Sequence, residues 1–240
     1  MKSVVKTISN CIVVYALSCM ISYNFLYGVE LQFEERFTLI GRSAGRALDK
    51  TEMDNGKATW EATQNVLVDS QKNEGALIAV DKKPFAGRIL IPAGTKKITV
   101  KATLRPEQAV GEKSWVAIGI GNPKLGIPVW GQGIFLYATT DGRFGLAGDP
   151  DPEDMMAKEL VMIKSGPIPE YEKGETVKVR LEYDVDIKTV SAWINEAQIC
   201  DNLNVSTKKF VVDPAFAGFS GYNQKVEISP IEKIQILISQ

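Results

Sequence analysis

The sequence contains no histidine. Histidine is the usual general base of Ser-His-Asp and Cys-His sites and a frequent zinc ligand, so its absence excludes those classes of catalysis and every metal site that needs imidazole. Positive charge is not in excess either, because 28 Lys and Arg stand against 29 Asp and Glu and no basic run is present. Binding to nucleic-acid phosphates depends on such an excess, so we expect no nucleic-acid partner.

Charge is also missing near the start of the chain. Lys2 and Lys6 precede a stretch from Thr7 to Val29 that contains no charged residue. This arrangement is typical of a secretory signal peptide, which we place at residues 1–28. Two alternatives are an uncleaved membrane anchor, since the stretch is long enough to span a bilayer, and a lipoprotein processing site at Ala16-Leu17-Ser18-Cys19. All three place the folded part outside the cytoplasm, secreted or in the cell envelope, with membrane contact only through this segment.

Cysteine is scarce in the remaining chain. Only Cys200 lies beyond residue 28, so the mature part cannot form an intramolecular disulfide. Residues 29–240 are numerous enough to bury a core without one, and no linker or repeat divides them, so we expect a single domain. Cys200 follows Ile199 and precedes Asp201, and a thiol without a positive neighbour is expected to be buried and inert.

The hydrophobic period of this part is two residues, as in β-strands. Residues 176–185 alternate apolar with charged side chains, and the alternation returns in residues 189–195 after a turn, which predicts a hairpin. Further strands are expected at residues 31–40, 58–68, 75–81, 86–92, 97–104, 115–120, 133–139, 143–147, 159–164, 209–213, 225–229 and 234–238. The turn signals between them include Asn55-Gly56, Pro92-Ala93-Gly94, Asn122-Pro123, Asp141-Gly142 and Gly166-Pro167.

Helical character is confined to residues 151–160. Many short strands without helical crossovers predict an all-β fold, an antiparallel two-sheet sandwich. The loop before this segment is strongly acidic, and Asp149, Asp151 and Asp154 could hold a structural calcium ion. The alternative is an exposed acidic loop without an ion, and we expect no other cofactor.

The aromatic residues suggest a binding function. Strand alternation places Trp193 on a polar face with Arg180 and Glu182 as neighbours. An aromatic plane beside polar groups suits a pyranose ring, which has an apolar C–H face and a rim of hydroxyls. Two loops contribute further polar and aromatic groups, so the candidate ligand-binding residues are Trp130, Gln132, Trp193, Arg180, Glu182, Tyr222 and Asn223. The alternative is that aromatics such as Trp115 and Trp130 cover the second face of a sheet.

Catalysis has one candidate motif. Glu182, Asp184 and Asp186 occupy alternate positions on one strand face, and paired carboxylates are the groups that hydrolyse glycosidic bonds. The alternative interpretation is a solvated strand edge that ends in a turn.

The order of the strands resembles the concanavalin A-like lectin/glucanase superfamily, and is most similar to laminin-G-like members in secreted bacterial proteins. The strands that carry the resemblance are residues 98–104, 114–119, 133–137, the hairpin 177–195 and 234–237. The resemblance implies a jelly-roll sandwich whose concave sheet or rim loops bind glycan. Those families usually have Asn-Gly after the second hairpin strand, where this chain has Asn195-Glu196, and the glutamate pair of the hydrolases is not spaced as usual.

Three functions follow as hypotheses. The first is a non-catalytic extracytoplasmic carbohydrate-binding or adhesion module whose partner is a glycan or polysaccharide. The second is a polysaccharide-cleaving glycoside hydrolase that uses only carboxylates, Glu182 with Asp154 or Glu112. The third is a structural cell-envelope protein that mediates protein contacts, which predicts an exposed apolar patch.

Overall fold

The computed structural model describes residues 30–40, 42–71, 74–81, 83–107, 113–121, 133–148, 161–206, 212–226 and 228–240. Several sequence expectations fall outside these residues. They are the signal peptide, the turn Asn122-Pro123, the helical segment 151–160, most of the strand expected at 209–213, and the residues Glu112, Trp130, Gln132, Asp149, Asp151 and Asp154.

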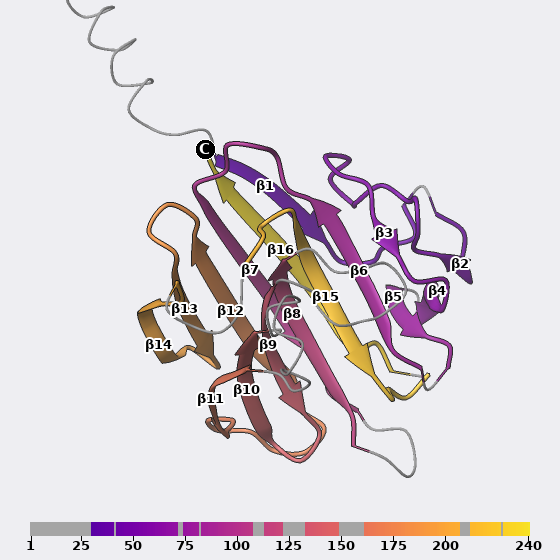
Figure 1. Ribbon diagram of the computed structural model, residues 1–240. Helices are drawn as coiled ribbons and strands as arrows, with labels where there is room; N and C mark the ends of the chain where they lie inside the picture. Colours follow the sequence, from indigo (N-terminus) through magenta and orange to yellow (C-terminus); the bar gives the residue numbers. More distant parts are fainter. Residues whose placement is uncertain are drawn as a thin grey trace, which may run out of the picture.

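The described residues form sixteen β-strands (Figure 1). Their bounds are β1 Glu30–Glu35, β2 Arg46–Ala47, β3 Glu61–Ala62, β4 Val66–Gln71, β5 Glu74–Ala79, β6 Phe85–Leu90, β7 Lys97–Leu104, β8 Trp115–Gly121, β9 Ile134–Thr139, β10 Arg143–Gly148, β11 Val161–Pro167, β12 Val177–Asp184, β13 Thr189–Ile194, β14 Ala197–Asn204, β15 Phe216–Tyr222 and β16 Ile231–Ser239. In this part of the chain, no helix is long and apolar enough to cross a membrane.

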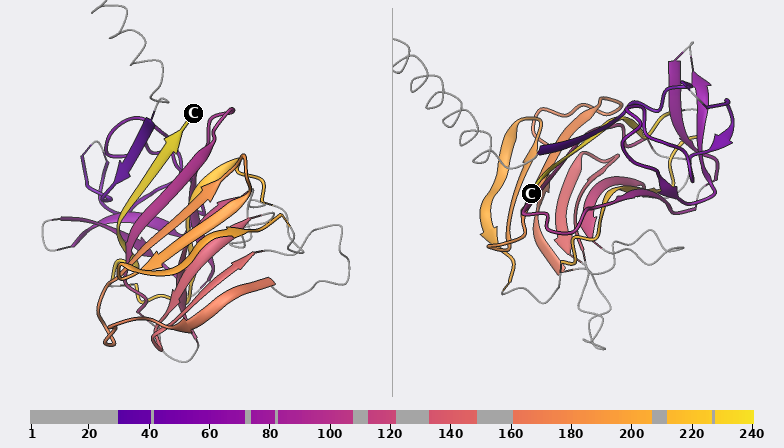
Figure 2. Two further views of the ribbon diagram at one scale, coloured as in Figure 1. Left: turned by 90° about the vertical axis from the view of Figure 1, so that its left-hand side faces the viewer. Right: turned by 90° about the horizontal axis from the view of Figure 1, so that it is seen from above.

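The strands build two large antiparallel sheets and one small one. The six-stranded sheet has the order β1-β16-β7-β12-β13-β14, and the seven-stranded sheet has the order β11-β10-β9-β8-β15-β6-β3. Figure 2 shows these sheets as two layers, with the three-stranded sheet β2-β4-β5 to one side. The predicted all-β antiparallel sandwich is confirmed.

The inward-facing positions of the two large sheets form the core. Ile98 and Val100 on β7, Leu181 on β12, and Val116 and Ile118 on β8 are all fully buried. Each such side chain stabilises the fold by about 1.5–3 kcal/mol through its removal from water. Because side chains alternate along a strand, the polar residues between these positions face outwards. Groups available to a ligand therefore lie on the outer faces of the sheets.

The predicted hairpin is confirmed as β12 and β13. Its turn is stabilised by Asp184, whose Oδ1 accepts hydrogen bonds from the backbone N–H groups of Asp186 and Ile187, both at 3.1 Å. The next connection, from β13 to β14, is the two-residue turn Asn195-Glu196. Both residues have positive φ, 45° and 69°, as in a type I′ turn. The asparagine and glutamate thus take the conformation that glycine adopts more easily.

Other strand expectations need correction. The strand expected at residues 31–40 ends at Glu35, and the one expected at 58–68 divides into β3 and β4. Gly166-Pro167 ends strand β11 instead of forming a turn, and residues 225, 226, 228 and 229 form no strand. Strands β14 and β15 were not expected, because neither shows the alternation of apolar and polar residues that marks the hairpin.

Candidate functional site

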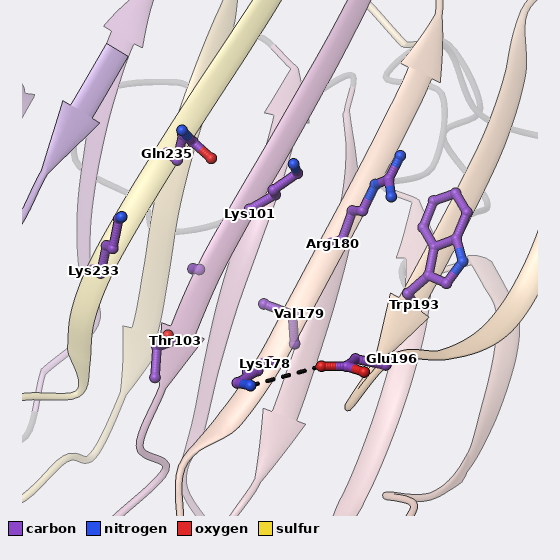
Figure 3. Close-up of a pocket in the computed structure, with 10 residues that line it drawn as sticks. Lys101, Thr103, Lys178, Val179, Arg180, Trp193, Glu196, Lys233 and Gln235 are labelled. Carbon is purple, nitrogen blue, oxygen red and sulfur yellow. Dashed lines mark ion pairs between the residues drawn. The ribbon is translucent and has the colours of Figure 1, made fainter. Parts of the chain in front are cut away.

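The candidate site is a groove on the outer face of the six-stranded sheet (Figure 3). Its volume is about 450 Å³, and strands β16, β7, β12 and β13 contribute to it. Two of the predicted ligand-binding residues, Arg180 and Trp193, line it, and Glu182 follows Arg180 on the same face of β12. The complete lining is Lys101, Ala102, Thr103, Lys178, Val179, Arg180, Trp193, Glu196, Lys233 and Gln235.

Antiparallel pairing brings groove residues from distant parts of the sequence into one row. Lys101 on β7 is the register partner of both Arg180 on β12 and Gln235 on β16. Arg180 is in turn the partner of Trp193 on β13. Because neighbouring strands lie about 4.8 Å apart, these four side chains form a continuous row across four strands.

Arg180 is held between Trp193 and Glu182. Its Cζ lies 4.3 Å from the centroid of the Trp193 ring, which is a cation–π contact. Its Nε donates a hydrogen bond to Oε1 of Glu182 at 2.7 Å, and its Nη2 contacts the same oxygen. These contacts orient the guanidinium and the indole before any ligand binds, which reduces the entropy lost on binding.

The carboxylate of Glu182 contacts two cationic side chains. Besides Arg180, the Nζ of Lys97 lies 2.7 Å from Oε2 of Glu182. Burial acts to raise the pKa of Glu182, but the hydrogen bonds and charges of Lys97 and Arg180 outweigh it, so the pKa lies below its usual value. A general acid needs a raised pKa. Glu182 therefore suits an electrostatic role in the groove better than proton donation to a leaving group.

Lys101 lies at the centre of the row and lacks such a counter-ion. Within the part of the chain that the structure describes, no carboxylate lies within ion-pair distance of its Nζ, whereas Lys233 pairs with Glu34 at 2.9 Å. Like charges on directly opposed residues of an antiparallel sheet are destabilising. The Lys101–Arg180 pair therefore lowers the stability of the free protein and forms a centre of positive charge in the groove.

Two other predicted ligand-binding residues lie away from the groove. Tyr222 ends strand β15 of the seven-stranded sheet, where it is the register partner of Trp115. Asn223 follows it and is 1% exposed, so its side chain is not accessible to a ligand. The structure therefore brings Arg180, Glu182 and Trp193 together and places Tyr222 and Asn223 elsewhere.

Aromatic side chains cover part of the outer face of the seven-stranded sheet. Trp115 and Tyr137 pack with Phe135 around the fully buried Ala117. A Cβ on Gly145 would lie 2.2 Å from the Tyr137 ring, so the glycine allows this ring to lie close against β10. For Trp115, this packing agrees with the interpretation that it covers a second sheet face.

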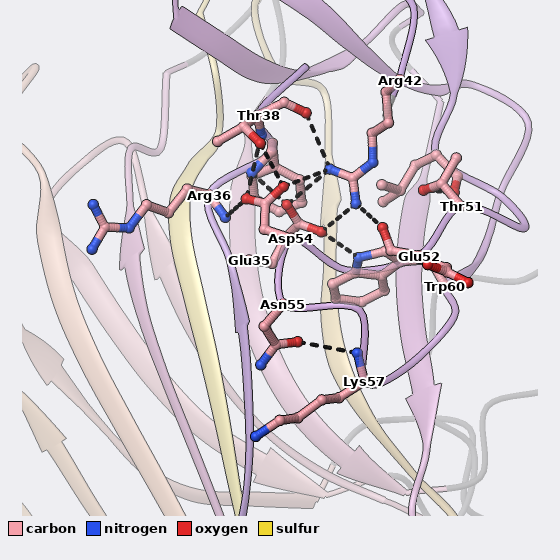
Figure 4. Close-up of polar contacts among 12 residues, drawn as sticks. Glu35, Arg36, Thr38, Arg42, Thr51, Glu52, Asp54, Asn55, Lys57 and Trp60 are labelled. Carbon is pink, nitrogen blue, oxygen red and sulfur yellow. Dashed lines mark hydrogen bonds and ion pairs between the residues drawn. The ribbon is translucent and has the colours of Figure 1, made fainter. Parts of the chain in front are cut away.

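A second cluster of Arg, Glu and Trp is buried, beside the three-stranded sheet (Figure 4). The Nη1 and Nη2 atoms of Arg42 lie 3.0 and 2.7 Å from the two carboxylate oxygens of Glu35. Trp60 donates its indole N–H to Oε2 of Glu35 at 2.9 Å, and the backbone N–H of Phe37 donates to Oε1 at 2.5 Å. The side chains of Arg42 and Glu35 are 3% and 0% exposed, so this cluster is part of the core.

Asp54 completes the buried cluster. Its carboxylate accepts hydrogen bonds from the Thr38 hydroxyl at 2.7 Å and from the Arg36 backbone N–H at 2.8 Å, and it lies 3.3 Å from Nη1 of Arg42. Burial acts to raise the pKa of Asp54, but these hydrogen bonds outweigh it and the pKa is lowered. Burial raises the pKa of Glu35, against the hydrogen bonds from Arg42 and Trp60. The cluster joins β1 to the loop that follows it and so has a structural role.

The described residues include no candidate metal site, and their one cysteine has an unreactive environment. In these ranges no group of three or more Cys, Asp or Glu side chains is arranged to hold a metal ion. Cys200 is half-buried, and burial raises the pKa of its thiol, which disfavours the reactive thiolate.

Lys101, Lys233 and Gln235 line the groove but were not among the predicted site residues. The alternation of residues 97–104 indicated that Lys101 faces outwards. It could not indicate that β7 lies between β12 and β16, because this pairing joins segments more than seventy residues apart in the chain. One feature of the sequence could have indicated the buried cluster. Glu35 is two residues from Phe33 on β1, and it therefore shares the inward face of this strand with an apolar residue.

Comparison with solved structures identifies the fold. Over 81% of this chain and 95% of that chain, the structure is similar to the carbohydrate recognition domain of Emp46p in its potassium-bound form, with a TM-score of 0.51 and 16% identity. The metal-free form of that domain gives 0.51 and 15% identity over 82% of this chain and 95% of that chain. A family 16 glycoside hydrolase, an endo-glucanase from Bacteroides ovatus, gives a TM-score of 0.47 and 14% identity over 86% of this chain and 97% of that chain.

The similarity to the two Emp46p structures, each with a TM-score of 0.51, shows the fold. The protein has the concanavalin A-like jelly-roll fold, as the order of its strands predicted. No protein-family model and no curated protein sequence matches the chain.

Proposed function

We propose that the protein is a non-catalytic carbohydrate-binding or adhesion module, and that polysaccharide binds in the groove of the six-stranded sheet. The observation that carries this proposal is the half-buried Trp193, oriented by Arg180 within a groove that also presents Lys101, Thr103 and Gln235. The part of the indole that Arg180 does not cover supplies the apolar surface that the C–H face of a pyranose packs against. The neighbouring ammonium, hydroxyl and amide groups supply hydrogen bonds to its hydroxyls.

The dimensions of the groove support this ligand class. About 450 Å³ falls within the range of small-molecule sites. A groove formed on a sheet surface, without enclosing walls, suits a few units of a longer chain. The shared fold gives further support, because the Emp46p domain is named as a carbohydrate recognition domain. The expected signal peptide at residues 1–28 supports a site of action outside the cytoplasm.

The two competing functions have less support. A hydrolase that relies on Glu182 as its acid is disfavoured by the lowered pKa of that residue. A protein-contact role would be favoured by one large apolar patch. Among the residues that the structure describes, the exposed large apolar side chains come from separate segments of the chain, and they are Ile40, Val80, Leu90, Met162, Ile187 and Val226.

A thermal-shift screen of residues 29–240 against a panel of polysaccharides, with and without calcium, tests the proposal. A ligand that binds the folded state raises the melting temperature. A rise with calcium alone would indicate an ion site, for which Asp149, Asp151 and Asp154 are the predicted ligands, and would give no support to sugar binding. Titration calorimetry with the best oligosaccharide then gives the affinity.

Two matched tryptophan variants locate the site. Trp193→Ala is expected to weaken binding by about tenfold or more, because the stacking plane is lost. Trp115→Ala, on the outer face of the other sheet, is expected to leave the affinity within about twofold. Circular dichroism of both variants shows whether they remain folded. If Trp115→Ala removes binding and Trp193→Ala does not, the proposed groove is wrong.

A further inference from the structure

We infer that the groove selects acidic polysaccharide, with an anionic substituent bound between Lys101 and Arg180. The inference rests on the proposed function, because it names the class of glycan that the same site takes. It adds a charge preference that an aromatic platform alone would not produce.

The balance of charge on this face supports an anionic ligand. Lys233 is matched by Glu34, and Lys178 by Glu196 at 3.7 Å. Glu182, the carboxylate that contacts Arg180, is shared between two cations, Lys97 and Arg180. The centre of the groove therefore retains positive charge, although the whole chain has a net charge of −1.

The position of Lys101 specifies where the anion would sit. Its register partners are Arg180 on one side and Gln235 on the other, and all three line the groove. Arg180 is directed by its bonds to Glu182, which leaves Lys101 facing a like charge. An oxyanion between them would accept charge-assisted hydrogen bonds from both cations and would relieve their repulsion.

The aromatic component favours a sugar over another polyanion. Trp193 borders the cationic pair directly, so an apolar ring surface and an anionic group would be bound side by side. A uronate and a sulfated sugar each present both features on one unit. These two sources share the same chemistry, an oxyanion on a pyranose, and they are separated by the choice of probe.

The test measures affinity for four probes by calorimetry at low and high salt. The probes are a hexamer of galacturonic acid, a chondroitin sulfate hexasaccharide, cellohexaose as the neutral oligosaccharide, and single-stranded DNA as a polyanion without a preference for this site. We expect at least one acidic oligosaccharide to bind about tenfold tighter than cellohexaose. This advantage should shrink as the salt concentration is raised.

Charge-neutralising variants assign the preference to Lys101. Lys101→Gln is expected to lose most of the advantage of the acidic probe, about tenfold, while its melting temperature stays unchanged or rises because a like-charge pair is removed. Lys173→Gln removes the same charge from an exposed loop position and serves as the matched control. It should bind all probes as the unmodified protein does.

The outcomes separate this inference from the proposed function. Equal affinity for cellohexaose and the acidic probes, abolished by Trp193→Ala, would overturn the charge preference and leave carbohydrate binding in place. No binding of any oligosaccharide would overturn both. DNA binding as tight as that of the acidic sugars would overturn the inference as well, because the groove would then be a general polyanion surface.

Discussion

The molecule contains two clusters of the same three residue types, and they differ in burial. Arg42, Glu35 and Trp60 form one, in the core beside the three-stranded sheet. Arg180, Glu182 and Trp193 form the other, on the outer face of the six-stranded sheet. In the buried cluster the indole donates its N–H to the carboxylate, whereas in the outer cluster the indole ring lies under the guanidinium.

Solvent access explains the different geometries. A buried carboxylate and guanidinium lose their hydration, and protein groups replace most of it. Arg42 binds both oxygens of Glu35 through Nη1 and Nη2, while its buried Nε has no hydrogen-bond partner among the described residues. The Arg180 side chain is 42% exposed, and water supplies what the protein does not. Its partners only need to orient it. An Arg–Glu–Trp cluster therefore specifies structure when it is buried and can present a surface to a ligand when it is open.

The largest expected effect is on the buried cluster. Arg42→Ala leaves the Glu35 carboxylate without its counter-ion in the core, which is expected to cost about 3–5 kcal/mol of unfolding free energy. Urea unfolding measures this loss. Arg180→Ala is the matched variant in the open cluster and is expected to cost less than about 1 kcal/mol. Equal losses in the two variants would contradict the distinction between a structural and a surface cluster.

A smaller effect is expected on the pH dependence of stability, through Glu182 in the open cluster. Since the pKa of Glu182 is lower in the folded state than in the unfolded state, its contribution to stability is fully present above the unfolded value, about 4.3, and is lost as the pH falls through the folded value. Glu182→Gln should therefore be less stable than the unmodified protein by about 1 kcal/mol at neutral pH.

The two proteins should differ less in stability at acid pH than at neutral pH, because Glu182 becomes protonated in the folded state as the pH falls through its lowered pKa. Urea titrations of both proteins at each of the two pH values measure the difference in their unfolding free energies. The contribution of the other carboxylates cancels in this difference, because both proteins contain them. A constant difference across this range would show that the Glu182 carboxylate is not stabilised by Lys97 and Arg180.

The smallest expected effect lies at the edge of the groove. Glu196 has a φ of 69°, a conformation that costs a residue with a Cβ about 1–2 kcal/mol. Glu196→Gly relieves this strain but adds backbone entropy to the unfolded state and removes the exposed pair with Lys178. We expect a net gain of about 0.5 kcal/mol, seen as a higher melting temperature.

Glu172→Gly is the control for this variant, because Glu172 is exposed and does not have positive φ. It should lower the melting temperature. A decrease for Glu196→Gly as well would contradict the type I′ geometry of this turn. Binding of an acidic oligosaccharide to Glu196→Gly should be unchanged or slightly tighter, because Lys178 loses its partner.

The sequence predicted local features better than distant ones. The hairpin β12–β13 was predicted because its alternation and turn are contiguous, and it places Arg180 beside Trp193. Strand β15 was missed because its outward positions Gly218 and Ser220 are small, which removes the polar half of the pattern. Lys101 was not assigned because strand order in a sheet depends on packing between distant segments.

Ligand binding beside Trp193 on the six-stranded sheet is tested directly by the indole signals in a nitrogen–proton correlation spectrum. The chain has four tryptophans, which Trp→Phe variants assign. During titration with the oligosaccharide that binds best, we expect the Trp193 signal to shift and the signal of the buried Trp60 to remain unchanged. A shift of the Trp115 signal with no change at Trp193 would contradict the claim and would place the ligand on the seven-stranded sheet.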